Sequence, residues 1–243
     1  NHMYIRIASN DFFAVSKDVV SKMIAGELTA AQAYQAFNAK LLAEEEPADN
    51  ETVLTSGKAY SNVFHANGGS AAFSVMANTL RGVYGTDVLL ATANSFTGSV
   101  LQADYNKKMA ASMIMPNGLM SRQRTMTGAE LKETVRAFVE GCEGGFVPFN
   151  RGSLPVVSGI AVEVKEANGS YTLTGITRNG QPLGDGDTVT VTCLATEKQM
   201  EALLASDSGT SAGEDAWVKS TWTDYVSGGK AVLAEPENYM TLR

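Results

Sequence analysis

The chain has 243 residues, of which 44% are hydrophobic and 19% are charged, so it is long enough to bury a sizeable core. Its net charge of −7 includes no basic block, which argues against nucleic acid or an anionic membrane surface as a partner. No segment approaches the ~20 apolar residues that cross a bilayer, so we expect no membrane span in this segment.

Residues 1–50 are predicted to form an appendage. Residues 1–3 are typical of a cloning remnant, and 4–9 alternate like a short strand. A helix is expected from 16 to about Gly26 and a second from Thr29 to about 41. The acidic, proline-containing linker at 44–50 then marks a boundary, so we divide the chain into an appendage at 1–50 and a main domain at 51–243.

The main domain begins with a pattern of mixed strands and helices. We expect a strand at 52–55, a helix at 72–84 ended by Gly85, and a nearly continuous apolar strand at 86–91. A run that apolar is typical of a strand buried on both faces. The loop at 94–98 follows this strand, where open α/β sheets commonly place ligand groups, and 103–111 is predicted to be helical.

The stretch 113–131 joins a turn, a strand and a helix in one local unit. An apolar run precedes the Pro116-Asn117-Gly118 turn, and a strand is expected at 119–125. Thr127 with Glu130 three residues later predicts a capping box at the start of the next helix. The rest of the domain is expected to pack against this unit.

The last third changes to a period of two. Residues 156–165, 171–178 and 187–194 alternate, and Asn179-Gly180 is a hairpin signal, so these segments predict an antiparallel β-meander. Amphipathic helices are expected at 197–204 and 214–225, followed by a short extended tail. The predicted fold class is α+β, with a mixed α/β N-terminal half, a β-meander and C-terminal helices.

The residues do not form a recognisable active site by themselves. A two-metal phosphoesterase needs several histidines, whereas this chain has His65 and His2, which falls within the cloning remnant. There is no nucleophile elbow for a serine triad, and Cys142 and Cys193 lack a CxxC spacing. The two cysteines fit either free buried thiols or one disulfide. We expect neither a metal nor another cofactor in this chain.

The order of short motifs resembles the C-terminal domain of the 5'-nucleotidase family, which includes UDP-sugar hydrolases and 2',3'-cyclic-nucleotide phosphodiesterases. The resemblance covers about residues 52–243. The segments that carry it are Ala77-Asn78-Thr79-Leu80-Arg81, Thr86-Asp87-Val88-Leu89, Pro116-Asn117-Gly118-Leu119, Thr127-Gly128-Ala129-Glu130-Leu131, Val157-Ser158-Gly159-Ile160 and Asn179-Gly180-Gln181-Pro182-Leu183.

This resemblance implies a face that holds a nucleotide base between two phenylalanines and helps to bind phosphate. The candidate residues for substrate binding on that face are Asn94, Thr97, Asn117, Gly145, Phe146 and Phe149. The chain also departs from the family. Asn117 and Leu119 replace a phenylalanine and an asparagine, the 94–97 loop lacks the family's arginine, and a Gly-Gly-Asp-Gly-Tyr loop is absent after Leu194. A neutral Thr97 does not supply the bidentate contact of an arginine.

The resemblance implies the substrate-binding domain of a secreted bacterial 5'-nucleotidase-like phosphohydrolase, inactive in isolation. Its divalent metals would then belong to a separate N-terminal metallophosphatase domain, its ligand would be a nucleotide or nucleoside, and its location would be extracellular, cell-surface or periplasmic. The alternative is a non-enzymatic interaction module that keeps the fold and has lost nucleotide recognition.

Overall fold

The computed structural model divides the chain into two compact units, Asn1–Glu51 and Thr52–Arg243. It describes residues 19, 21–28, 32, 51–115, 118–140, 154–168, 170–204, 209–229 and 231–243. In the first unit, residues 21–24 are helical and the chain turns at Gly26, whose φ is +74°, as expected for a helix that ends there. The strand predicted at 4–9 lies outside the described residues, as does the second helix apart from Gln32.

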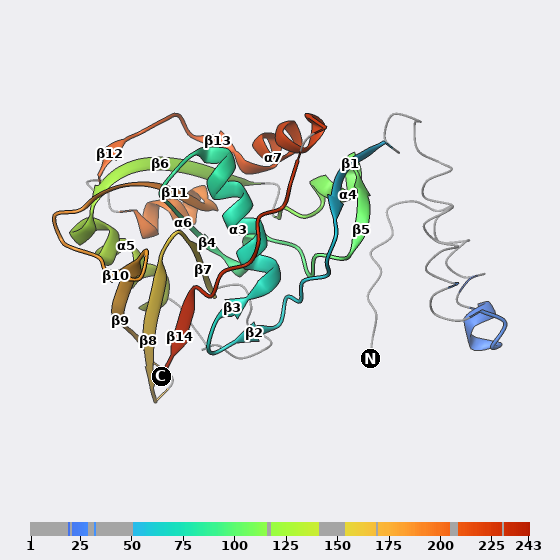
Figure 1. The fold of residues 1–243 in the computed structure, drawn as a ribbon, viewed down its shortest axis with the longest axis horizontal. Helices are drawn as coiled ribbons and strands as arrows, with labels where there is room; N and C mark the ends of the chain where they lie inside the picture. The colour runs from blue at the N-terminus through green and yellow to red at the C-terminus, as the bar shows by residue number, and fades with distance from the viewer. Residues whose placement is uncertain are drawn as a thin grey trace. The chain divides into compact units, whose positions relative to one another are not determined.

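The centre of the second unit is a six-stranded sheet with the order β12-β6-β11-β4-β7, in which β13 also pairs with β6 (Figure 1). Among its described pairs, β11–β4 alone is parallel, because β6, β7, β12 and β13 all pair in antiparallel fashion. The strands are β4 (Val88–Thr92), β6 (Leu119–Thr127), β7 (Pro155–Ser158), β11 (Thr188–Thr196), β12 (Thr210–Ser211) and β13 (Ala216–Trp217).

Three smaller sheets flank this one. A four-stranded sheet has the order β10-β9-β8-β14, in which β14 pairs with β8 in parallel. Two-stranded sheets are formed by β1 with β5 and by β2 with β3. Their strands are β1 (Thr52–Ser56), β2 (Phe64–His65), β3 (Gly69–Ser70), β5 (Ala103–Asn106), β8 (Ala161–Ala167), β9 (Ser170–Arg178), β10 (Gln181–Pro182) and β14 (Met240–Leu242).

The helices cover these sheets. Helix α3 packs on β4 and β7, α5 on β6 and β9, and α6 on β11, while α7 contacts β6, β13 and α4. The indole Nε1 of Trp222, which is fully buried, donates to the carbonyl of Ala110 at 2.7 Å and joins α7 to α4. The helices are α3 (Ala71–Tyr84), the short 3-10 helix η2 (Ala93–Ser95), α4 (Lys107–Ala111), α5 (Gly128–Glu140), α6 (Glu197–Leu203) and α7 (Val218–Ser227).

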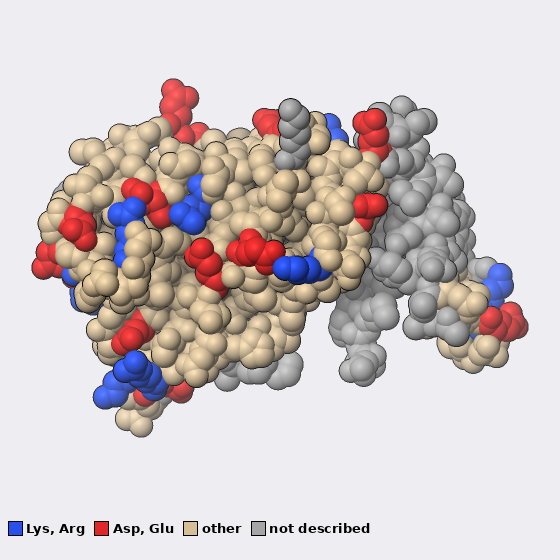
Figure 2. Space-filling model, in the orientation of Figure 1, with Lys and Arg blue, Asp and Glu red and all other residues tan. Residues whose placement is uncertain are grey.

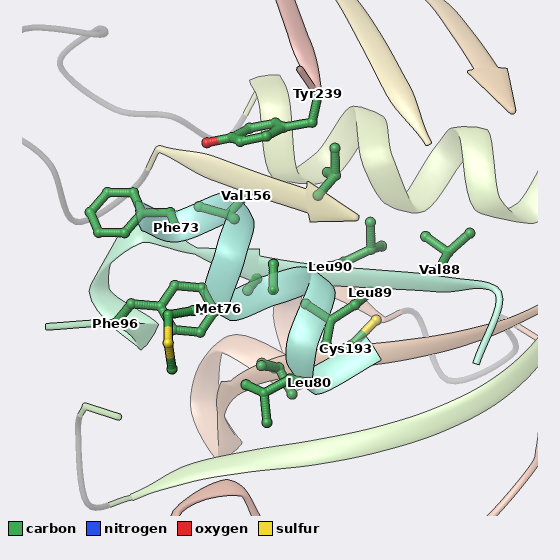
Figure 3. Packing of buried hydrophobic residues seen from close by; sticks show 14 of the residues in the cluster. Phe73, Met76, Leu80, Val88, Leu89, Leu90, Phe96, Val156, Cys193 and Tyr239 are labelled. Atoms are coloured by element: carbon green, nitrogen blue, oxygen red, sulfur yellow. The ribbon is translucent and has the colours of Figure 1, made fainter. Parts of the chain in front are cut away.

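The core lies between α3 and the six-stranded sheet. Figure 3 shows Phe73, Met76 and Leu80 of α3 in one apolar cluster with Leu89 and Leu90 of β4. Both leucines of β4 are fully buried, which confirms a strand covered on both faces. Burial at about 25 cal/mol per Å² of apolar surface makes this cluster the main source of stability in the unit.

Local signals place the helix ends where the sequence predicts them. Thr127 N donates to Glu130 Oε2 at 2.7 Å, and Glu130 N donates to Thr127 Oγ1 at 3.2 Å, so the predicted capping box is formed. Gly85 ends α3 with a φ of +66°, and the Ser70 side chain accepts from Phe73 N at its start.

Three predicted elements differ from the structure. Residues 103–111 are not one helix, because β5 pairs with β1 first and α4 begins after Asn106, whose Oδ1 accepts from Met109 N at 2.8 Å. The meander comprises β8, β9 and β10 alone, since β11 leaves it to lie between β6 and β4 in the larger sheet. Helix α7 begins at Val218, and Ala216–Trp217 pair with β6 instead.

The last thirteen residues form a strap across α3, which Figure 1 draws as the red segment leading to β14. Here "the C-terminal strap" means residues 231–243. Ala234 N donates to Thr79 Oγ1, Asn78 Nδ2 donates to the Glu235 carbonyl, and Ser74 exchanges two hydrogen bonds with Glu237, all at 2.8–2.9 Å. The strap therefore satisfies polar side chains that a buried helix face would otherwise leave unpaired.

Candidate functional site

Several loops meet where β4 and β11 end. These strands are parallel and adjacent, so their carboxyl ends lie at one edge of the sheet. Leu119 at the start of β6 pairs with Thr196 at the end of β11, and Pro155 at the start of β7 pairs with Thr92 at the end of β4. We call this edge the β4 rim, made of residues 92–97, 112–115, 119, 154–155 and 196.

Backbone hydrogen bonds hold the loops of the β4 rim together. Ala93 N donates to the Leu154 carbonyl at 2.9 Å, Thr97 N donates to the Met113 carbonyl at 3.0 Å, and Met115 N donates to the Ser95 carbonyl at 3.0 Å. Residues 113–115, and residue 154 next to β7, are thus fixed against the 93–97 loop. Open α/β sheets bind ligands at such carboxyl ends.

A buried aromatic pair holds the 93–97 loop against the core. Phe96 is only 6% exposed and stacks on Phe73 of α3, with ring centroids 6.2 Å apart and an interplanar angle of 29°. Figure 3 shows both rings at the end of β4. Phe96 therefore belongs to the core, and its ring is not available to stack on a base.

Ser95 is the feature of this loop that sequence reasoning missed. It is fully buried, and its hydroxyl has no hydrogen-bond partner among the described residues. A buried unsatisfied hydroxyl costs about 1–3 kcal/mol, so native proteins rarely keep one without a reason. No sequence pattern separates a buried orphan serine from an ordinary loop serine, which explains why the sequence did not reveal it.

Two of the six predicted site residues are described, and both lie on the β4 rim. Asn94 is exposed, and its side chain makes no hydrogen bond to another described residue. Thr97 is also exposed, but its Oγ1 donates to the Ser112 carbonyl at 2.6 Å, so this hydroxyl stabilises the loop. The other four predicted residues, Asn117, Gly145, Phe146 and Phe149, lie outside the described residues.

Within the part of the chain that the structure describes, no three His, Cys, Asp or Glu side chains come together to hold a metal ion. His65 is exposed on β2. Cys193 is fully buried, and burial raises the pKa of its thiol to about 12, so it is not a nucleophile at neutral pH. Cys142 lies outside the described residues.

The opposite, amino end of β4 carries a polar network around Asp87. Thr190 donates to Asp87 Oδ2 from its amide at 2.8 Å and from its hydroxyl at 3.0 Å, and Arg178 Nη2 donates to Oδ1 at 2.5 Å. Burial alone would raise the pKa of Asp87, but these hydrogen bonds and the charges of Arg178 and Arg81 outweigh it and lower that pKa. The carboxylate thus joins β4 to β11 and β9.

A second chain of polar contacts ties α3 to β7 at this end. Arg81 Nε donates to Ser158 Oγ at 2.8 Å, and Ser158 Oγ donates in turn to Asn78 Oδ1 at 2.5 Å. Gly159 follows with a φ of +81°, and a β-carbon there would lie 2.0 Å from the Asp87 carbonyl oxygen. Only glycine allows this close approach.

Comparison with known proteins identifies the fold. No family model matches the chain, and its sequence matches no curated protein. Solved structures do match. The 5'-nucleotidase precursor of Thermus thermophilus matches with a TM-score of 0.60 at 14% identity, and the match covers 88% of this chain and 43% of that one. Sulfate thiohydrolase SoxB of Thermus thermophilus matches with a TM-score of 0.60 at 14% identity, covering 90% of this chain and 40% of that one.

The NAD nucleotidase of Haemophilus influenzae matches with a TM-score of 0.58 at 17% identity, covering 88% of this chain and 42% of that one. The fold is that of these 5'-nucleotidase-type chains. The resemblance and the mixed fold predicted from the sequence are therefore confirmed at the level of fold. The chain spans about two fifths of each of these structures, as expected of one domain within a longer chain.

The described surface carries charges of both signs. On the face drawn in Figure 2, the Lys and Arg side chains are interspersed with Asp and Glu, and the described residues of that face form no basic patch. None of the described helices is both long and apolar enough to span a bilayer.

Proposed function

We propose that the unit Thr52–Arg243 is a substrate-binding domain of a 5'-nucleotidase-like phosphohydrolase, and that its ligand is a nucleotide or nucleoside bound at the β4 rim. The observation that carries this proposal is the convergence of the 93–97 loop with residues 113–115, 119 and 154–155 at the carboxyl ends of two parallel strands. The fold is shared with chains named 5'-nucleotidase and NAD nucleotidase.

The chemistry of the β4 rim suits recognition of a polar ring. Asn94 offers an exposed amide with both donor and acceptor capacity, and Ser95 adds a buried hydroxyl without a partner among the described residues. Phe146 and Phe149 are the proposed stacking rings. Base–aromatic stacking contributes about 1–3 kcal/mol per base, so such rings would supply most of the affinity.

Catalysis would depend on a separate domain. The described residues contain no cluster that fits a divalent metal, so this part of the chain does not fit the metals expected of the family. We infer that a metallophosphatase domain N-terminal to this unit would hold them, and that the 243-residue chain does not hydrolyse AMP. By the same resemblance, the protein would act outside the cytoplasm, at the cell surface or in the periplasm of a bacterium.

Isothermal titration of the chain with adenosine, AMP and UMP tests the binding proposal. Saturable binding with a Kd of about 1 mM or tighter is expected. Phe146→Ala or Phe149→Ala should weaken it by about 5- to 150-fold, since a stacking contribution of about 1–3 kcal/mol is lost. Asn94→Ala should weaken it by about 5-fold, the effect of one hydrogen bond. Asn238→Ala changes an exposed asparagine at the amino end of β4 and is the matched control for Asn94.

The second candidate is an interaction module without nucleotide recognition. Two observations favour it. The Thr97 hydroxyl is hydrogen-bonded to the Ser112 carbonyl, and the Phe96 ring is buried against Phe73, so neither is available to a ligand. The two hypotheses predict opposite results in this titration. No saturable heat with any of the three ligands supports the interaction module, whereas binding that is lost on Phe146→Ala or Phe149→Ala supports the substrate-binding domain.

A further inference from the structure

A cleft of about 410 Å³ opens at the amino end of β4, opposite the β4 rim. It lies where the end of α3 and the β7–β8 turn meet the β9–β10 turn and the C-terminal strap. Its volume falls within the range of small-molecule sites, about 300–1,000 Å³. Its lining is mostly polar, which excludes an apolar ligand. The residues that matter for its chemistry are Arg81, Asp87, Gly159, Arg178, Asn179 and Glu237.

The inner wall of this cleft has more hydrogen-bond donors than the protein uses. A guanidinium group carries five N–H donors, yet Arg178 donates to Asp87 through Nη2, and Arg81 donates to Ser158 and, at 3.5 Å, to the Asp87 carbonyl. Asp87 already accepts three hydrogen bonds and is largely satisfied. The surplus of donors calls for a ligand that is rich in acceptors.

The charged side chains of the cleft also bear on the kind of ligand that it can bind. Asp87 offsets one of the two guanidinium charges, so these three side chains carry one net positive charge, which Glu237 in the same lining balances. Glu237 at the mouth is exposed, and its carboxylate makes no ion pair with a described residue. Gly159 and the exposed Asn179 also line the cleft, where they add backbone amides and a side-chain amide. Two guanidinium groups in one cleft can each donate two hydrogen bonds to a pair of oxygens of a carboxylate or phosphate.

We propose that this cleft binds a small organic anion through its carboxylate or phosphate group, with Arg178 and Arg81 as the donors. The site is separate from the nucleotide site proposed above, because the two lie at opposite ends of β4. It does not depend on that proposal, and either one can fail while the other stands.

Titration calorimetry of the 243-residue chain with citrate and with inorganic phosphate, at constant ionic strength, tests the site and tells the two anion classes apart. At least one anion is expected to bind saturably. Arg178→Gln should weaken it by about 10-fold or more, since a charge-assisted contact is lost. Arg136→Gln is the control, because it removes the same charge from α5, where Arg136 pairs with Glu133 and Glu140. It should leave the affinity unchanged.

Glu237→Gln supplies a test that leaves the Asp87 network untouched. Removal of the opposing carboxylate at the mouth should tighten anion binding by about 2- to 5-fold, the size of a surface charge effect. The proposal is overturned if neither anion saturates up to about 10 mM. It is equally overturned if Arg178→Gln and Arg136→Gln weaken binding alike. If Arg178→Gln does not fold, unchanged or weaker binding by Glu237→Gln overturns it.

Discussion

Replacing Gly159 with alanine should destabilise the unit more than any replacement of an exposed turn glycine. Gly159 has a φ of +81°, which costs a non-glycine residue about 1–2 kcal/mol. Its new β-carbon would also lie 2.0 Å from the Asp87 carbonyl oxygen, so the β7–β8 turn or the start of β4 has to move. Overpacking of this kind adds about 1–3 kcal/mol. We therefore expect a loss of about 2–5 kcal/mol in the free energy of unfolding.

Gly85 is the matched control for this substitution. It has a similar φ of +66°, but a β-carbon there would have no atom within 4 Å. Gly85→Ala should therefore cost only the backbone term of about 1–2 kcal/mol. Urea unfolding followed by tryptophan fluorescence measures both, because Trp217 and Trp222 both lie in this unit. Equal losses for the two variants would refute the clash between Gly159 and Asp87.

Three further predictions concern buried polar groups. The pKa of Asp87 is lowered, so the stability that it contributes is present above its unfolded value of about 3.9 and is lost as the pH falls through the folded one. The gap in unfolding free energy between wild type and Asp87→Asn should thus shrink below about pH 4, and a gap that does not change with pH contradicts this. In a Cys142→Ser variant, native Cys193 should not react with a thiol reagent at about pH 8 until urea unfolds the chain, since burial raises its pKa to about 12; immediate reaction would show that the thiol is accessible. Tyr239→Phe should cost about 1–3 kcal/mol in urea unfolding because the buried Ser70 amide loses its acceptor. Tyr60 is half-buried, but its hydroxyl makes an exposed hydrogen bond to Glu235, so Tyr60→Phe should cost less than about 1 kcal/mol. Equal costs would argue against a role for the hydrogen bond to Ser70.

Local chemistry predicted the helices and the buried strand well. The capping pair of Thr127 and Glu130 and the αL glycine Gly85 act within a few residues, so their effect can be read from the sequence without knowledge of the fold. The apolar run that became β4 needs no partner to be recognised as a buried strand.

Pairing between distant segments was not predictable from local pattern. Residues 103–106 form a strand because they pair with β1, which lies about fifty residues earlier in the chain. Strand β11 alternates like the outer strand of a meander, yet it lies in the centre of the large sheet. Its threonines meet polar partners there, as Thr192 does through its hydroxyl contact with Thr86 at 2.9 Å. The alternation reflects those buried polar contacts, and it did not reveal that the strand joins the large sheet.

For the candidate site, the sequence predicted the position but not the contacts of its residues. The sequence put Asn94 and Thr97 at the end of a buried strand, and the structure places both on the β4 rim. It did not show that the Thr97 hydroxyl is engaged with Ser112 or that Ser95 is buried without a partner among the described residues. These properties depend on how residues 112–115 return to the loop, which is a long-range contact.

The two ends of β4 explain why the motifs of this chain report its fold better than its function. Ser158 hydrogen-bonds to both Arg81 and Asn78, which joins β7 to α3, and Asp87 accepts from Thr190 of β11. A change in any of these residues leaves a polar group unpaired. Asn94 on the β4 rim is exposed and makes no such contact with a described residue, so a change there should cost little stability. Motif resemblance at the amino end of the strand is therefore strong support for the architecture. We propose nucleotide recognition at the carboxyl end, and it has to be measured there.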